Sequence, residues 1–145
     1  ISELNVFEHS KKDLKTVPII CYETIYGEFV SSYTKKGGDF ITIISNDAWW
    51  GNTEGHRQLN SYARLRAIEN RRYIVRSANS GISSIINHRG EVLSTLAYEE
   101  YGILTGSAKK VTGKTFYNSY GDFIARISIF ISISMFFIFI VKSKK

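Results

Sequence analysis

The pattern of hydrophobic and polar positions along this chain is typical of a layered α/β domain followed by a segment of a different kind. Apolar, β-branched runs predict a strand buried on both faces at residues 17–21 and a second buried strand at 40–45. A short helix is expected between them at 26–33, ended by the glycines at 37 and 38. Two buried strands separated by a helix suggest a βαβ unit.

A longer helix is predicted over residues 55–72, after a loop rich in aromatic side chains. Two rows of small or apolar side chains recur along it, and we expect both rows to share its packed face. The rows are Leu59, Ala63 and Ala67, and Tyr62, Leu65 and Ile68.

Further strands are predicted at residues 73–77, 82–87 and 92–96, with a weaker candidate at 102–107. The turn His88-Arg89-Gly90 joins two of them as a hairpin, because its glycine can adopt a positive φ. Helices alternating with strands, followed by a hairpin, predict an α/β fold rather than a bundle or a sandwich of sheets.

The last segment, residues 127–141, consists of apolar residues and serines alone. With residues 123–125 it reaches about 19 residues, close to the ~20 that a helix needs to cross a bilayer. Arg126 interrupts it near one end, from where a long side chain can reach the interface. Because lysines follow the run, we favour a transmembrane helix over a buried core helix or a pair of strands, with a cytoplasmic C-terminus.

Composition and charge narrow the class of protein. The chain has 145 residues, 43% of them hydrophobic, which is enough for one domain with a core and excludes a disordered chain. The net charge of +6 would suit nucleic acid, but the basic residues are spread out, apart from Lys142, Lys144 and Lys145 beside the apolar run. No nucleic-acid partner is therefore expected, and the terminal cluster is interpreted as a membrane-side charge.

The predicted organisation has four parts: the end of an upstream segment at 1–16, an α/β domain at 17–122, a transmembrane helix at 123–141 and a basic tail at 142–145. The chain starts at Ile1, without a signal peptide, so we expect it to be a piece of a longer protein.

The single cysteine, Cys21, is the first candidate for chemistry. A free cysteine is commonly a buried, inert side chain. Cys21, however, ends a predicted strand just before a helix, and such a corner of an α/β sheet points into the crevice where ligands bind. Glu23 is either a group of this pocket that supports catalysis by Cys21 or a first-turn charge that the helix dipole favours. Tyr22 either packs or shapes the pocket.

Four ordered blocks of sequence, between about residues 17 and 92, resemble the apolipoprotein N-acyltransferases of the nitrilase superfamily. The blocks are Ile20-Cys21-Tyr22-Glu23 with Tyr26-Gly27-Glu28, Ile44-Ser45-Asn46-Asp47-Ala48-Trp49-Trp50-Gly51, Ala63-Arg64-Leu65-Arg66-Ala67-Ile68-Glu69, and Arg76-Ser77-Ala78-Asn79-Ser80-Gly81-Ile82-Ser83 with the turn Arg89-Gly90-Glu91. The C-terminal apolar run occupies the place of this family's last transmembrane helix.

The resemblance implies part of a nitrilase-like (CN hydrolase) layered sandwich, without a cofactor, on the periplasmic side of a bacterial inner membrane. Cys21 would be the nucleophile that takes an acyl chain from a phospholipid as a thioester. The acceptor would be the N-terminal amine of a diacylglyceryl-cysteine apolipoprotein. Tyr22, Trp49 and Trp50 would line a substrate pocket near the membrane surface, although core packing is an equal alternative for one of the tryptophans.

The chain departs from the family in two places. The family's glutamate base and oxyanion lysine lie upstream of the cysteine, and the acidic and basic residues before Cys21 sit in no matching motif, so we expect this chain to lack both groups and to be inactive alone. His56 stands where the family commonly has proline, and we expect an exposed polar residue at the helix start rather than a base.

Two other classes of function stay open. The first is a soluble nitrilase-type amidase acting on small amides or nitriles, and the second is a membrane-tethered binding or scaffold domain with an idle cysteine. A metal site is not expected, because His9, His56 and His88 are far apart in the sequence and have no cysteine partners.

Overall fold

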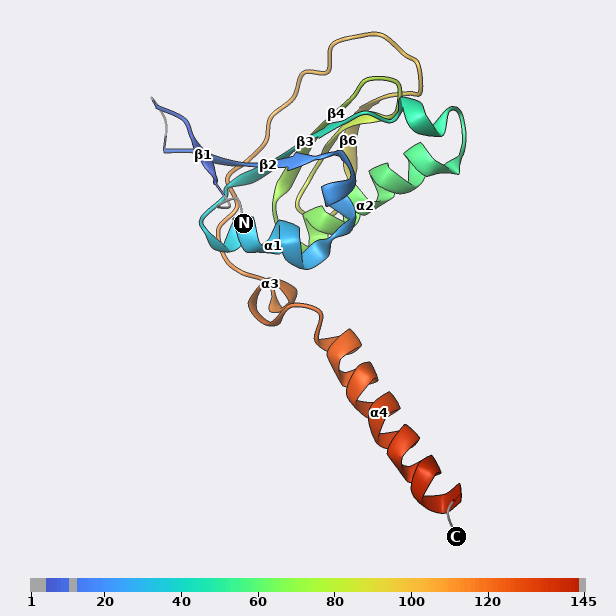
Figure 1. The fold of residues 1–145 in the computed structure, drawn as a ribbon. Helices are drawn as coiled ribbons and strands as arrows, with labels where there is room; N and C mark the ends of the chain where they lie inside the picture. The colour runs from blue at the N-terminus through green and yellow to red at the C-terminus, as the bar shows by residue number, and fades with distance from the viewer. Residues whose placement is uncertain (1–4, 11–12, 144–145) are drawn as a thin grey trace.

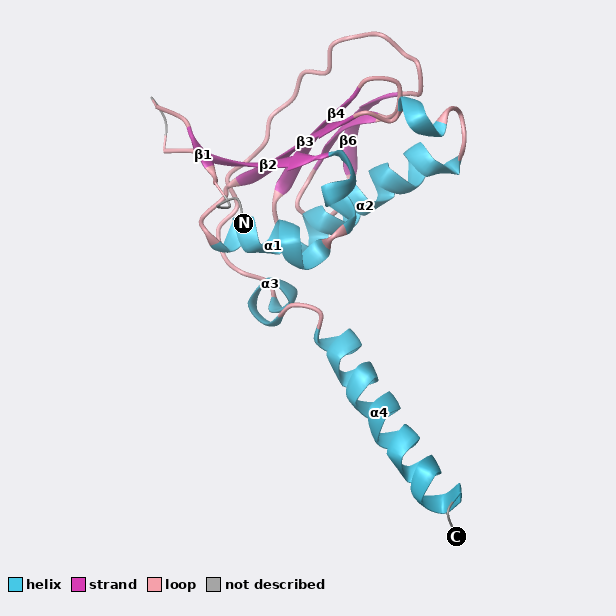
Figure 2. Ribbon diagram, in the orientation of Figure 1, coloured by secondary structure: helices cyan, strands magenta, loops and turns pink. Residues whose placement is uncertain are grey.

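The computed structural model describes residues 5–10 and 13–143, which form an α/β domain followed by a long C-terminal helix (Figure 1). The α/β class predicted from the sequence is confirmed. Figure 2 shows the strands in one layer, with helices α1 and α2 beneath one face of the sheet. The last helix, α4, extends away from the domain.

The sheet has six strands in the order β1-β2-β3-β4-β5-β6. They span, in that order, Phe7–Glu8, Lys15–Ile20, Phe40–Ser45, Tyr73–Ala78, Ser83–Ile86 and Val92–Leu96. Strands β2, β3 and β4 are parallel, whereas β1 pairs antiparallel with β2, and β5 and β6 complete an antiparallel meander after β4. The predicted βαβ unit is therefore present, with α1 (Gly27–Lys35) between β2 and β3 and α2 (Glu54–Asn70) between β3 and β4.

The core lies between the sheet and these two helices. It is built from aliphatic side chains that alternate along the strands and from small residues of α2: Val17, Ile19, Val30, Ile41, Ile43, Ala63, Ala67, Ile74 and Ile86. The prediction that residues 17–21 are buried on both faces is wrong. Helices cover only one face of β2, so Val17 and Ile19 are buried while Ile20 is exposed.

Helix α2 has a narrower packed face than predicted. Leu59, Ala63 and Ala67 are buried, but the row of Tyr62, Leu65 and Ile68 is exposed. Rows spaced by three and by four residues diverge around a helix of 3.6 residues per turn, and the single sheet beneath α2 reaches only one of them.

The strand expected at residues 102–107 is absent, because this segment runs as an irregular connection. Glycine residues, which are depleted from strands, occupy positions 102 and 106. Gly106 approaches the side chain of Ile85 on the sheet. The connection leads to a short helix that the sequence did not reveal, α3 (Phe116–Tyr120).

Helix α4 spans Phe123–Ser143. It has a mean hydropathy of 2.4, and none of its most apolar window is buried in the protein. By length and composition it could cross a membrane, and it is the one such helix among residues 5–10 and 13–143.

Candidate active site

Cys21 lies where strand β2 turns into the 3-10 helix η1 (Cys21–Ile25). Its φ of +48° places it in the left-handed region, which side chains with a Cβ rarely occupy. Such a conformation at the end of a parallel strand directs the side chain out of the ladder, at the sheet edge where ligands of α/β proteins bind. The thiol is partly exposed.

The segment after the neighbouring strand, β3, supplies the hydrogen-bond acceptor for the thiol of Cys21. Ile20 pairs with Ile44, so β2 and β3 end side by side. Asn46 follows β3, and its carbonyl oxygen lies 3.9 Å from Cys21 Sγ as a hydrogen-bond acceptor. Among the described residues, this is the one hydrogen-bond contact that the thiol makes.

The side chain of Glu23 contacts the backbone next to Cys21. Its Oε2 accepts a hydrogen bond from the backbone N–H of Ile20 at 2.8 Å, which binds the start of η1 to the end of β2. The carboxylate thus holds the backbone on both sides of Cys21. Its predicted supporting role in catalysis stays a prediction, but the contact shows how it would act, through the position of the thiol.

The predicted aromatic residues are not equivalent. Tyr22 stacks on Trp50, with ring centroids 6.4 Å apart and an angle of 18° between the planes. Both rings line a cavity of about 110 Å³ above the first turns of α2. Trp49 is 84% exposed instead, in the 3-10 turn η2 (Ala48–Trp50). The substrate contacts proposed for all three residues stay predictions.

A polar network that the sequence did not reveal supports the loop after β3. Asp47 is fully buried and forms an ion pair with Arg76 of β4, with Oδ2 2.7 Å from Nη2. Its other oxygen, Oδ1, accepts a hydrogen bond from Ser45 Oγ at 2.6 Å. Asn79 Oδ1 accepts a hydrogen bond from the backbone N–H of Asp47, and Asn79 Nδ2 donates one to Asn46 Oδ1. The segment that contacts the thiol is therefore fixed at several points.

His56 is not the exposed residue that we expected. It is 1% exposed, and its ring lies against Tyr98 with centroids 4.7 Å apart. The first turn of α2 faces the loop after β6, which covers the ring. Among the described residues, no group of three or more His, Cys, Asp or Glu side chains is placed to hold a metal ion.

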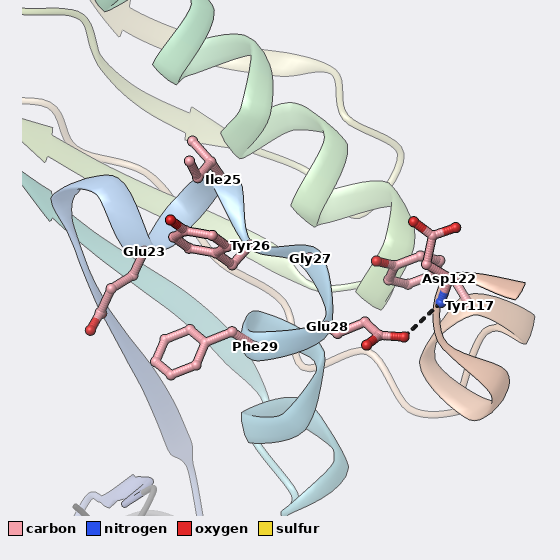
Figure 3. Close-up of a pocket in the computed structure, with 8 residues that line it drawn as sticks. All are labelled: Glu23, Ile25, Tyr26, Gly27, Glu28, Phe29, Tyr117 and Asp122. Carbon is pink, nitrogen blue, oxygen red and sulfur yellow. Dashed lines mark hydrogen bonds between the residues drawn. The ribbon is translucent and has the colours of Figure 1, made fainter. Parts of the chain in front are cut away.

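A cavity of about 670 Å³ lies between Glu23 of η1 and Asp122, the residue before α4 (Figure 3). Its lining residues come from η1, from the first turn of α1 and from the junction of α3 with α4: Glu23, Ile25, Tyr26, Gly27, Glu28, Phe29, Tyr117 and Asp122. Glu28 Oε1 accepts the backbone N–H of Asp122 at 2.9 Å, which joins the two sides of the cavity. Burial, with Glu69 nearby, raises the pKa of Tyr117, so its hydroxyl is a neutral hydrogen-bonding group at physiological pH.

The family model of the carbon-nitrogen hydrolases matches residues 3–115 of this chain. Among curated proteins, the apolipoprotein N-acyltransferase of Geobacter metallireducens is 37% identical over 107 residues, covering 74% of this chain and 20% of the relative. Apolipoprotein N-acyltransferase 2 of Leptospira interrogans is 38% identical over 125 residues, covering 81% of this chain and 20% of the relative. The chain thus spans about a fifth of the length of these relatives.

Solved structures confirm the nitrilase fold. Nit3 of Saccharomyces cerevisiae, a member of branch 10 of the nitrilase superfamily, matches 69% of this chain and 39% of its own, with a TM-score of 0.57 and 18% identity. A mutant amidase from Nesterenkonia sp. AN1, which carries acrylamide at its active-site cysteine, matches 69% of this chain and 41% of its own, with a TM-score of 0.53 and 17% identity.

Proposed function

We propose a function from the premise that this chain belongs to the carbon-nitrogen hydrolase family and that its curated relatives are apolipoprotein N-acyltransferases. The chain is the cysteine-bearing part of an acyltransferase that moves an acyl chain from a phospholipid to the N-terminal amine of a diacylglyceryl-cysteine apolipoprotein. The observation that carries this proposal is the cavity between Glu23 and Asp122. It starts at Glu23, two residues after Cys21, and reaches Asp122, the residue that precedes the apolar helix α4, so it would hold an acyl chain between the membrane helix and the corner that carries the thiol.

In the first half of the proposed reaction, the Cys21 thiolate attacks the ester carbonyl carbon of the phospholipid. A C–S bond forms, the ester C–O bond breaks, and the lysophospholipid leaves with its hydroxyl oxygen carrying the proton that the base had taken from the thiol. In the second half, the apolipoprotein amine attacks the thioester carbonyl carbon, the amide C–N bond forms, the C–S bond breaks, and the proton that the amine loses returns through the base to the thiol. A thiol suits both halves, because it attacks an ester readily and leaves readily.

We propose that the base and the group that stabilises the oxyanion come from outside this chain. Among the described residues, the contact of Cys21 Sγ is a backbone carbonyl, which neither accepts a proton for catalysis nor stabilises negative charge. Glu23 lies nearby, but its Oε2 is occupied by the N–H of Ile20. The part of the chain that the structure describes would therefore carry the nucleophile without the groups that activate it.

We further propose that α4 crosses a bacterial inner membrane, with the domain on the periplasmic side and the C-terminus in the cytoplasm. The lysines at its end support this direction, since cytoplasmic ends of such helices are enriched in Lys and Arg. Both proposed substrates are lipids of the bilayer, so this anchor keeps the thiol at the surface that holds them.

A chimaera tests the proposal, with this chain replacing the matching segment of the Leptospira interrogans relative. With a radiolabelled acyl chain on the phospholipid, we expect label on the protein in a linkage that hydroxylamine cleaves, and transfer to an apolipoprotein peptide. Cys21→Ala should abolish both, and the isolated chain should take up no label. Transfer by the Cys21→Ala chimaera would refute the role of Cys21, and label on the isolated chain would refute the missing base.

A further inference from the structure

An exposed cluster of three aromatic rings lies at the junction of α3 with α4. Phe116 and Tyr120 are one turn apart, with ring centroids 4.5 Å apart, and Phe123 meets Phe116 edge-to-face at 4.9 Å. The three residues, which we call the aromatic collar, are 60%, 61% and 36% exposed. Contiguous exposed apolar surface of this kind commonly marks a contact with a protein or a membrane.

The opposite side of α3 is bound firmly to the domain. Asn118 is buried, and its Nδ2 donates to Ser31 Oγ at 2.9 Å and to Thr34 Oγ1 at 2.7 Å, both on α1. The hydroxyl of Thr115 donates to the backbone carbonyl of Glu69 at the end of α2. Because two helices of the domain hold α3, the direction of the collar is fixed.

The collar also lies at a defined level along α4. Arg126, in the first turn of α4, reaches back to the domain, with Nη2 2.6 Å from Glu28 Oε1 and Nη1 3.1 Å from the carbonyl oxygen of Tyr120. The charged group is thus held beside the collar, and the uninterrupted apolar run begins beyond it. Figure 1 shows α3 between the domain and α4.

We propose that the aromatic collar lies in the headgroup layer of the membrane that α4 spans, and that it sets the height of the Glu23–Asp122 cavity above the bilayer. The proposal rests on the membrane span in the proposed function. Tyrosine and tryptophan rings are enriched at the membrane–water interface, and Tyr120 supplies such a ring beside the two phenylalanines of the collar. The partner is lipid rather than protein, because Phe123 joins the collar to the start of α4, and the collar thereby continues the exposed apolar surface of that helix.

Tryptophan fluorescence tests the position of the collar. In a Trp49→Phe, Trp50→Phe background, one tryptophan is introduced at a time into the full chain in vesicles of phosphatidylcholine with a minority of phosphatidylglycerol. The test variants are Phe116→Trp and Tyr120→Trp, which keep an aromatic ring at an exposed position. The aqueous control is Tyr101→Trp, in a loop position that is 96% exposed, and the deep control is Ile131→Trp within α4.

We expect lipids brominated near the headgroup end of the acyl chain to quench both test variants at least about twofold more than the Tyr101→Trp control. Lipids brominated near the chain methyl should quench mainly Ile131→Trp. If the test variants are quenched no more than Tyr101→Trp while Ile131→Trp is still quenched, the collar does not lie in the headgroup layer, although α4 still spans the membrane. Protection from aqueous iodide without quenching by lipid would refute this position in favour of a protein contact. If Ile131→Trp itself is not quenched, α4 does not span the membrane, and the proposed position of the collar is refuted with it.

Discussion

Arg76 and Asp47 form an ion pair in which both side chains are almost fully buried, with Nη2 2.7 Å from Oδ2. Arg76 also donates through Nη1 to the carbonyl of Ile82, and Asp47 accepts from Ser45 Oγ, so neither charge depends on one contact alone. Asp47 directly follows Asn46, whose carbonyl contacts the thiol of Cys21. The pair therefore connects the stability of the domain to the geometry of the candidate active site.

Removing one member of this pair should destabilise the domain strongly. In Asp47→Ala, the guanidinium of Arg76 is left buried without its counter-charge, which typically lowers the free energy of unfolding by about 3–5 kcal/mol. Urea unfolding in detergent, followed by circular dichroism, measures this loss. Asp13→Ala is the matched control, because Asp13 is exposed and the loss of its pair with Lys110 should change stability far less. Equal effects of the two variants would contradict the prediction.

The left-handed backbone of Cys21 predicts an unusual order of stability. A residue with a Cβ at a φ of +48° costs about 1–2 kcal/mol, whereas glycine occupies this region freely. Part of this gain is offset by the greater entropy of glycine in the unfolded chain, so Cys21→Gly should be more stable than Cys21→Ala by about 0.5–1 kcal/mol. The same unfolding measurement compares the two.

The control for this comparison is Ala48→Gly in the turn η2, where φ is not positive and glycine should destabilise by about 0.5–1 kcal/mol. If Cys21→Gly were less stable than Cys21→Ala, the corner would not be strained. The predicted order would mean that a cysteine at this corner is kept at the expense of stability.

The buried hydrogen bonds of Asn118 should determine how firmly α3 is held against the domain. Its buried amide also lies 3.3 Å from Asn70 Oδ1 on α2, in addition to its bonds to α1. Asn118→Ala removes the buried donor to Ser31 Oγ, whereas Thr34 Oγ1 and Asn70 Oδ1 stay hydrogen-bonded to each other, and the loss of such a buried partner typically lowers stability by about 1–3 kcal/mol. We expect faster hydrogen exchange and faster proteolysis in residues 113–122, whereas Ser119→Ala, at an exposed hydroxyl, should change neither. Unchanged exchange in Asn118→Ala would show that other contacts hold α3.

The sequence was sufficient to predict features that depend on local pattern. The β-branched runs and the turn at Gly90 located the strands of the sheet, and the apolar run located α4. The pairing of Asp47 with Arg76 could not be predicted, because it depends on the register of β3 against β4, in which Ile43 lies opposite Arg76. Both residues lie within blocks that resemble the family, and only this resemblance marked them.

Burial was the property that sequence predicted least well. His56 was expected to be exposed because it begins a helix, but the loop after β6 covers it, which is a contact between distant segments. Helix α3 was missed because five residues are too short to show a helical period. The corner of Cys21 was predicted correctly as the end of a strand, whereas its positive φ has no signal in a sequence that places no glycine there.

The last prediction concerns Glu69, whose carboxylate is buried beside α3. Oε1 lies 3.1 Å from Arg66 Nη2, and Oε2 is buried without a hydrogen-bond partner. Burial raises the pKa of Glu69 above its ordinary value near 4.5, and Asp122 raises it further, while Arg66 opposes the shift. The folded state thus holds this proton more tightly than the unfolded state does.

A raised pKa means that Glu69 contributes stability at low pH that is lost as the pH rises through the pKa of the folded state. Glu69→Gln is neutral at every pH and keeps an oxygen that can accept from Arg66. We therefore expect the free energy of unfolding of the unaltered chain, minus that of Glu69→Gln, to fall as the pH rises from below 4.5 to neutral. Urea unfolding of both proteins across this range measures the difference, in which groups common to both cancel. A difference that stays level or rises would show that the attraction of Arg66 outweighs burial, and that the carboxylate is more stable charged than neutral at this position.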